Sequence, residues 1–145
     1  MILNLRKVLL ASITILVFSC AEDTSEKYAE YEKLFQQVLE VHDEVMPKMG
    51  DLPGLEQQLQ KIADTSANPR IYLEAEKQLE RSDSLMMGWM HSFSDEFVKK
   101  KPSVKKMSNQ EIQQEIDALQ AELKKVRRME DEISASLINA QELVR

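Results

Sequence analysis

Two short segments of the chain gather the side chains best suited to bind a metal or a cofactor. They run from His42 to Met49 and from Met86 to Phe93, and together they hold both histidines, the only tryptophan and five of the seven methionines that follow Met1. Thioether and imidazole groups favour copper(I), and a His–Met pair holds haem iron in some four-helix cytochromes. The residue types therefore raise one chemical hypothesis, a copper(I) or haem carrier.

The helical phase of these segments limits that hypothesis. Successive residues of a helix turn by about 100°, which puts His42 in the middle of an apolar face, whereas His91 and Met87 lie more than a quarter turn from theirs. The two histidines do not converge on one site, so the preferred interpretation is a methionine-rich core around Trp89, and no metal or cofactor is expected. The residues kept as candidate ligands for the alternative are His42, Met46, Met49, Met86 and Met90.

Two polar residues, His42 and Glu130, fall within otherwise apolar helix faces and are candidates for a structural polar core. A buried imidazole needs hydrogen-bond partners, and a polar residue in such a face can fix which helices pair. Counting along the helices places Glu130 near Tyr28 and Tyr31, so one hypothesis is a phenol–carboxylate hydrogen bond. The preferred interpretation is a drift of helical phase, in which Met129 takes the core position and Glu130 is solvated.

The chain offers little for catalysis, and no enzymatic activity is expected. It has no G-x-S-x-G, no Gly-rich phosphate loop and no H-E-x-x-H, and its single cysteine lies near the N-terminus. Asp43 and Glu44 follow His42 directly, but adjacent residues of a helix point in different directions and do not converge on one substrate.

The N-terminal segment has the features of an export signal. Met1–Ser19 contains no acidic residue, and Arg6 and Lys7 precede the apolar or small stretch Val8–Phe18. This stretch is too short to cross a bilayer as a helix, which takes roughly 20 residues, but it suits the apolar region of a signal peptide.

The end of that stretch, Val17-Phe18-Ser19-Cys20, resembles the lipobox of bacterial lipoproteins. The resemblance implies cleavage before Cys20, a diacylglycerol thioether on its thiol and acylation of the new N-terminus. Acyl chains stabilise membrane attachment by about 0.8 kcal/mol per buried methylene, so the anchor in the lipid bilayer would be permanent. Residues 1–19 are interpreted as the signal peptide, 20–25 as the lipidated cysteine and tether, and 26–145 as the folded domain. The alternative is an ordinary secretory signal, or a short membrane helix, with an incidental cysteine.

The charge of the mature chain argues against nucleic acid as a partner. Loss of the signal leaves 17 basic and 25 acidic residues, a net charge of −8, which nucleic acid and anionic lipid repel. One basic cluster is interpreted as a solvated loop between helices, with lipid head groups or an acidic partner as the alternative. Its members are Lys99, Lys100, Lys101, Lys105 and Lys106.

Apolar residues recur at alternating steps of three and four along the rest of the chain, the pattern of helices packed in a bundle. Pro47 and Gly50 predict the end of a first helix, Asp51 the start of a second, and a capping box from Ser108 to Glu111 the start of the last. The expected apolar faces span Tyr28–Met49, Leu52–Ile62, Tyr72–Phe93 and Ile112–Val144.

These faces predict an all-α, antiparallel bundle with the order up-down-up-down, built from three long helices and one short one. In that order the first and third helices end at the same end of the bundle, which brings the two Met/His segments together beside the start of the last helix. The same spacing fits an oligomeric coiled coil, so self-association is retained as an alternative.

The segments His42-Asp43-Glu44-Val45-Met46-Pro47-Lys48-Met49-Gly50 and Met86-Met87-Gly88-Trp89-Met90-His91-Ser92-Phe93, after a lipoprotein signal, give the chain a wider resemblance. It resembles a group of small uncharacterised lipoproteins of Bacteroidetes-type bacteria, some of them labelled "viral A-type inclusion protein". The resemblance implies an outer-membrane lipoprotein of the cell envelope, on its periplasmic face or at the cell surface, and it supplies no activity. The expected role is binding or scaffolding with an envelope protein as partner.

Overall fold

The computed structural model describes residues 23–145, and every regular element in this part of the chain is helical. The prediction of an all-α bundle with three long helices is confirmed. Cys20 and the predicted signal segment lie outside the described residues. The elements are α1 (Ser25–Met49), α2 (Leu52–Thr65), α3 (Arg70–Phe93), a π-helical turn η1 (Ser94–Val98), α4 (Lys101–Val104) and α5 (Asn109–Leu143).

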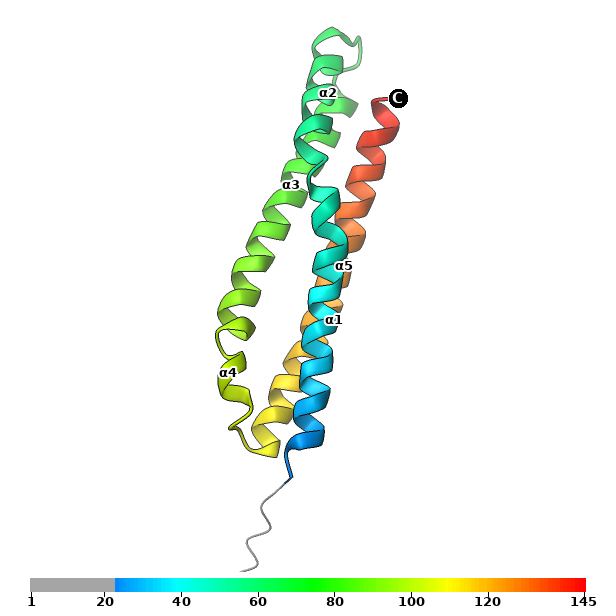
Figure 1. Cartoon of the computed structure of the whole chain (residues 1–145). Coiled ribbons are helices and arrows are strands. Elements are labelled where there is room, and N and C mark those ends of the chain that lie inside the picture. Colours follow the sequence, from blue (N-terminus) through cyan, green and yellow to red (C-terminus); the bar gives the residue numbers. More distant parts are fainter. Residues whose placement is uncertain (1–22) are drawn as a thin grey trace, which may run out of the picture.

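The helices form three long arms, which are α1 with α2, α3, and α5 (Figure 1). α2 continues in the direction of α1, α3 runs back, and α5 returns parallel to α1. The starts of α1 and α5 are joined by two hydrogen bonds of 3.4 Å each: the Lys27 ammonium donates to the Asn109 carbonyl, and the Asn109 amide donates to the Asp23 carbonyl. The bundle is therefore up-down-up in three arms, where four alternating helices were expected.

The backbone between α1 and α2 explains why the chain does not reverse there. Gly50 has φ −62° and ψ −21°, and Asp51 has φ −81° and ψ −19°, both in the right-handed helical region. A glycine that ends a helix and turns the chain usually adopts the left-handed region, and Gly50 does not. Pro47 is accommodated inside α1, and Asp51 precedes α2 without a side-chain capping bond.

The start of α5 agrees with its sequence signature. The Ser108 Oγ accepts a 3.4 Å hydrogen bond from the Glu111 backbone N–H, and the Glu111 carboxylate accepts one of 2.8 Å from the Ser108 N–H. This reciprocal pair satisfies two donors that a helix N-terminus otherwise leaves open. The capping box predicted from the sequence is confirmed.

Three lysines of the basic cluster lie in ion pairs at the α3–α5 connection. The ammonium groups of Lys99, Lys100 and Lys101 lie 2.6, 3.0 and 2.8 Å from carboxylate oxygens of Asp95, Glu115 and Glu32, respectively. Lys101 also lies 4.1 Å from the centroid of the Phe35 ring, so it contacts α1 by charge and by a cation–π contact. Lys105 and Lys106 are exposed.

A chain of aromatic rings forms part of the core between α1 and α3. Phe35 on α1 and Phe93 on α3 have ring centroids 5.4 Å apart, and Phe93 stacks on Trp89 at 5.0 Å and on Phe97 at 5.3 Å. The other core residues are mainly aliphatic, and the whole buried cluster lies between Tyr31 and Ala140. Residues 22–145 therefore contain the complete described core and are suited to study without the predicted signal segment.

Candidate functional site around Trp89

The side chain of Trp89 connects all three arms. On one side its indole Nε1–H donates a 2.6 Å hydrogen bond to Oε1 of Glu122 on α5. Both residues are buried, with 4% of Trp89 and 8% of Glu122 exposed. The Lys125 ammonium lies 3.3 Å from the same Glu122 oxygen, so this buried carboxylate has both a neutral and a charged partner.

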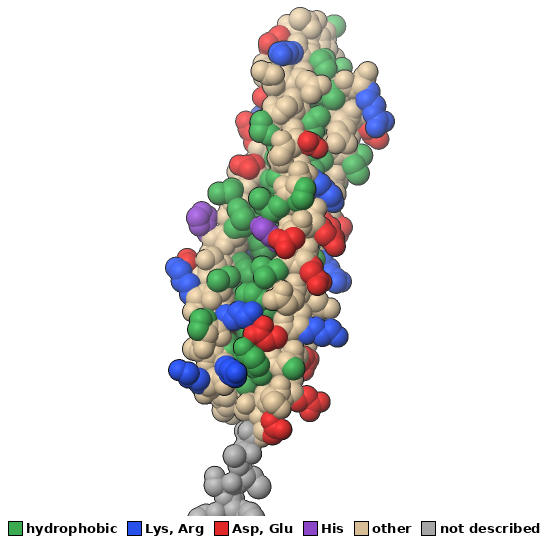
Figure 2. Space-filling model, viewed as in Figure 1, with side chains coloured by type: hydrophobic (Ala, Val, Ile, Leu, Met, Phe, Trp, Pro, Cys, Tyr) green, Lys and Arg blue, Asp and Glu red, His purple; other side chains and the backbone are tan. Residues whose placement is uncertain are grey.

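On the other side of Trp89 lies His42 of α1. The two rings stack with centroids 5.6 Å apart, and the His42 Nδ1 lies 2.9 Å from Oδ1 of Asp43. The expectation that His42 is buried was wrong, because 21% of its side chain is exposed. α1 and α3 meet here through side chains, and Figure 2 shows hydrophobic and histidine side chains at the surface along these two helices.

The two Met/His segments do meet, at the stacking of His42 on Trp89. They meet because α3 runs antiparallel alongside α1, and the part of α5 that Trp89 contacts is around Glu122, not its start. Of the candidate ligands, Met86 is buried, Met49 and Met90 are half-buried and Met46 is exposed. Within residues 23–145, no three His, Cys, Asp or Glu side chains are grouped so that they could hold a metal ion.

Glu130 is not part of a polar core. It is half-buried, while Met129 beside it is buried with 7% exposed. Since α5 runs parallel to α1, the tyrosines near the start of α1 lie by the start of α5. The nearby charge of Glu115, not of Glu130, contributes to the raised pKa of Tyr31. The Tyr28 hydroxyl donates a 2.6 Å hydrogen bond to Glu32 of its own helix. The hypothesis of a contact between Glu130 and these tyrosines was therefore wrong, and the structure supports the preferred interpretation, in which Met129 takes the core position.

The buried carboxylate of α5 is Glu122, which the sequence analysis missed. Continued steps of three and four from Ile112 put Leu123 and Glu130 on the apolar face. A strict seven-residue pattern drifts by about 20° per heptad against a straight helix, so Glu122 and Met129 take these inward positions instead. The sequence feature that could have indicated a buried acceptor such as Glu122 is Trp89, because the indole N–H of a buried tryptophan usually has an acceptor.

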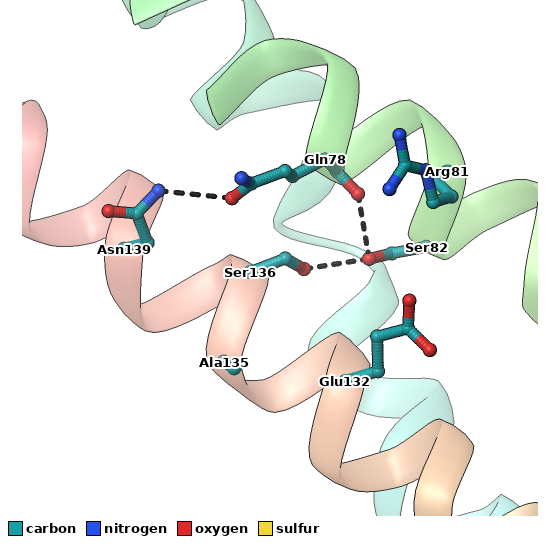
Figure 3. A pocket seen from close by; sticks show the side chains of 7 residues that line it. All are labelled: Gln78, Arg81, Ser82, Glu132, Ala135, Ser136 and Asn139. Carbon is teal, nitrogen blue, oxygen red and sulfur yellow. Dashed lines mark hydrogen bonds between the residues drawn. The ribbon is translucent and has the colours of Figure 1, made fainter. Parts of the chain in front are cut away.

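A polar hollow of about 490 Å³ lies between α3 and α5, further toward the start of α3 (Figure 3). Ser82 and Ser136, both buried, lie there with their Oγ atoms 2.7 Å apart, and Asn139 donates to Gln78 at 3.2 Å. Each serine Oγ also lies within hydrogen-bond distance of a carbonyl of its own helix, so one serine donates to the other and the second donates to its own helix. These hydrogen bonds join α3 to α5.

A second hollow, of about 550 Å³, lies beside Trp89 on the same α3–α5 face. Its lining combines the buried side chains of Trp89 and Met129 with the exposed cations Lys125 and Arg128. Gly88 belongs to the lining too, and a Cβ built on it would meet no atom within 4 Å.

No helix among residues 23–145 has the length and apolarity needed to cross a bilayer. Comparison with known proteins returned no matching family model, no matching curated protein and no matching solved structure. The chain is therefore assigned to a class by its fold alone, as an all-α helical bundle.

Proposed function

We propose that the protein is a lipoprotein of the bacterial envelope, anchored through Cys20, whose helical bundle acts by binding or scaffolding and not by catalysis. One observation carries the proposal: α1 begins at one end of an elongated molecule, only five residues after Cys20. A lipid at Cys20 would hold the bundle by that end.

The dimensions of the bundle support a scaffolding role. α5 has 35 residues, which at 1.5 Å per residue gives a length of about 50 Å. An anchor at one end leaves the sides of all three arms open to an envelope partner or to a second copy of the chain.

The anchor is tested by expressing the full chain in a Gram-negative host with an alkyne-labelled fatty acid. Wild type should carry the label, lose residues 1–19 and partition into detergent, whereas Cys20→Ala should do none of these. Ser19→Ala is the matched control, because it keeps a small residue before the cysteine and should behave as wild type. An unlabelled wild type, or a Cys20→Ala variant that still partitions into detergent, would overturn the proposal.

A second candidate function, the copper(I) or haem carrier, is favoured by the stacking of His42 on Trp89, which joins the two Met/His segments. A carrier would bind copper(I) one-to-one under reducing conditions, or show a haem Soret band, and would lose either in His42→Ala and Met46→Leu. Met107→Leu, outside both segments, is the control. A colourless protein that leaves copper(I) with a competing chelator would exclude this candidate.

A further inference from the structure

The hollow beside Trp89 combines an apolar floor with a charged mouth. Trp89 and Met129 are buried and Leu85 is half-buried, so the inner surface is apolar. Lys125 and Arg128 are exposed lining residues from α5. The volume of about 550 Å³ lies within the range of small-molecule sites, roughly 300–1,000 Å³.

Gly88 contributes no side chain to the wall of this hollow. A Cβ at this exposed lining position of α3 would meet no atom within 4 Å. Gly in a helix interior costs about 1 kcal/mol relative to alanine, and no close approach of another element requires the glycine here. The position beside Trp89 therefore has room for a larger side chain, which makes it suitable for a test of the hollow.

The two cations at the mouth differ in whether they already have an ionic partner. The Lys125 ammonium lies 3.3 Å from the buried Glu122, which partly neutralises it. Arg128 has no ion pair with any described residue, and its guanidinium has donors arranged to bind a carboxylate. Glu132, one turn further along α5, also lines the hollow and is the one group there that opposes an anion.

We propose that this hollow binds a single-chain anionic amphiphile, a medium-chain carboxylate, with its chain on Trp89, Leu85 and Met129 and its head group on Arg128 and Lys125. The apolar floor accounts for the chain and the cations account for the head group. The proposal goes beyond the lipid anchor, which concerns the other end of the chain, and either one can fail without the other.

Trp89 supplies the measurement, because it is the only tryptophan of the protein and lies in the floor of the hollow. Residues 22–145 are titrated with dodecanoate below its micelle concentration while tryptophan emission is recorded. Dodecyltrimethylammonium and a sugar-headed dodecyl detergent have the same chain with a cationic or neutral head. We expect saturable binding of dodecanoate and at least about tenfold weaker binding of the cation. Equal binding of all three would overturn the proposal, because it would leave only unspecific apolar contact.

Two pairs of variants locate the site. Gly88→Leu should fill the hollow and weaken dodecanoate binding at least tenfold, whereas Gly54→Leu on α2, where a Cβ also meets no atom within 4 Å, should bind as wild type. Arg128→Gln should weaken binding about tenfold, while the neighbouring exposed Arg127→Gln, outside the hollow, should not. Glu132→Gln should strengthen it. If Gly88→Leu fails to fold, as judged by circular dichroism, the arginine pair decides, and equal affinities of Arg128→Gln and Arg127→Gln would overturn the proposal.

Discussion

The indole of Trp89 on α3 and the carboxylate of Glu122 on α5 form a buried hydrogen bond of 2.6 Å. The residues are 33 positions apart in the sequence, and their bond joins the middle arm of the bundle to the last one. This donor and acceptor are costly to separate, because the buried indole N–H would then be left without water or a partner. The pair therefore contributes to stability and also selects how α3 and α5 align.

The first prediction concerns Glu122. Glu122→Leu removes the acceptor of the indole N–H, and we expect the free energy of unfolding to fall by about 1–3 kcal/mol. Glu122→Gln keeps an acceptor oxygen and is the matched control, with a smaller loss. Urea unfolding followed by circular dichroism measures both. Equal stability of the two variants would show that the hydrogen bond does not matter.

The second prediction concerns Tyr31, which is fully buried and whose hydroxyl has no hydrogen-bond partner among the described residues. Burial, with smaller effects of Glu115, Glu32 and Tyr28, raises its pKa from 10.0 to about 12. The folded state thus holds the proton more tightly than the unfolded state, so the stability from this group is complete below pH 10 and is lost as the pH rises toward 12.

Tyr31→Phe should accordingly lose less stability than wild type between pH 10 and 12, the range set by the shifted pKa. At pH 7 it should be at least as stable as wild type within about 1 kcal/mol, because it removes a hydroxyl that is buried without a partner. Thermal unfolding at pH 7 and across the range of pH 10 to 12 is the measurement. Tyr72→Phe, at a half-buried position, is the control. A large loss at pH 7 would mean that the hydroxyl has a partner in solution.

The third prediction concerns Glu56 on α2, which faces acidic residues of α3. Burial, then Glu80, Glu76 and Asp83, raises the pKa of its carboxyl above 4.5. Because the folded-state pKa is raised, the stability that the protonated Glu56 contributes is complete below about pH 4.5 and is lost as the pH rises through that pKa. At neutral pH the ionised carboxylate therefore destabilises the fold.

Glu56→Gln should therefore raise the free energy of unfolding at pH 7, by up to about 1 kcal/mol, and change it little at pH 4. Glu40→Gln on the exposed side of α1 is the control and should change it at neither pH. The explanation fails if the gain is the same at pH 4 as at pH 7.

The fourth prediction concerns the buried serines Ser82 and Ser136, whose Oγ atoms lie 2.7 Å apart. Small side chains let α3 and α5 approach here, so Ser136→Leu should overpack the contact and lower stability by about 1–3 kcal/mol. Ala135→Leu, at the exposed neighbouring position, should be close to neutral. Urea unfolding compares them, and a neutral Ser136→Leu would show that the helices have room to separate.

The positions of the helices and their ends could be predicted, because the information is local. Three-and-four spacing identified buried faces that include Val38, Leu79 and Ile116, and the reciprocal bonds of Ser108 and Glu111 follow from a four-residue signature. The site was predicted only in part. Trp89 and His42 do meet, but their meeting point on α5 was placed too early along the chain.

The sequence by itself determined that this chain is a helical bundle, and which residues turn inward for most of each helix. Only the tertiary structure decided that α2 extends α1, because Gly50 and Asp51 remain in the helical region when their sequence also suits a reversal. That single junction makes α5 parallel to α1. Which residue faces Trp89 then depends on how far the phase of a long straight helix has drifted from its seven-residue pattern, and Glu122 therefore holds the position beside Trp89.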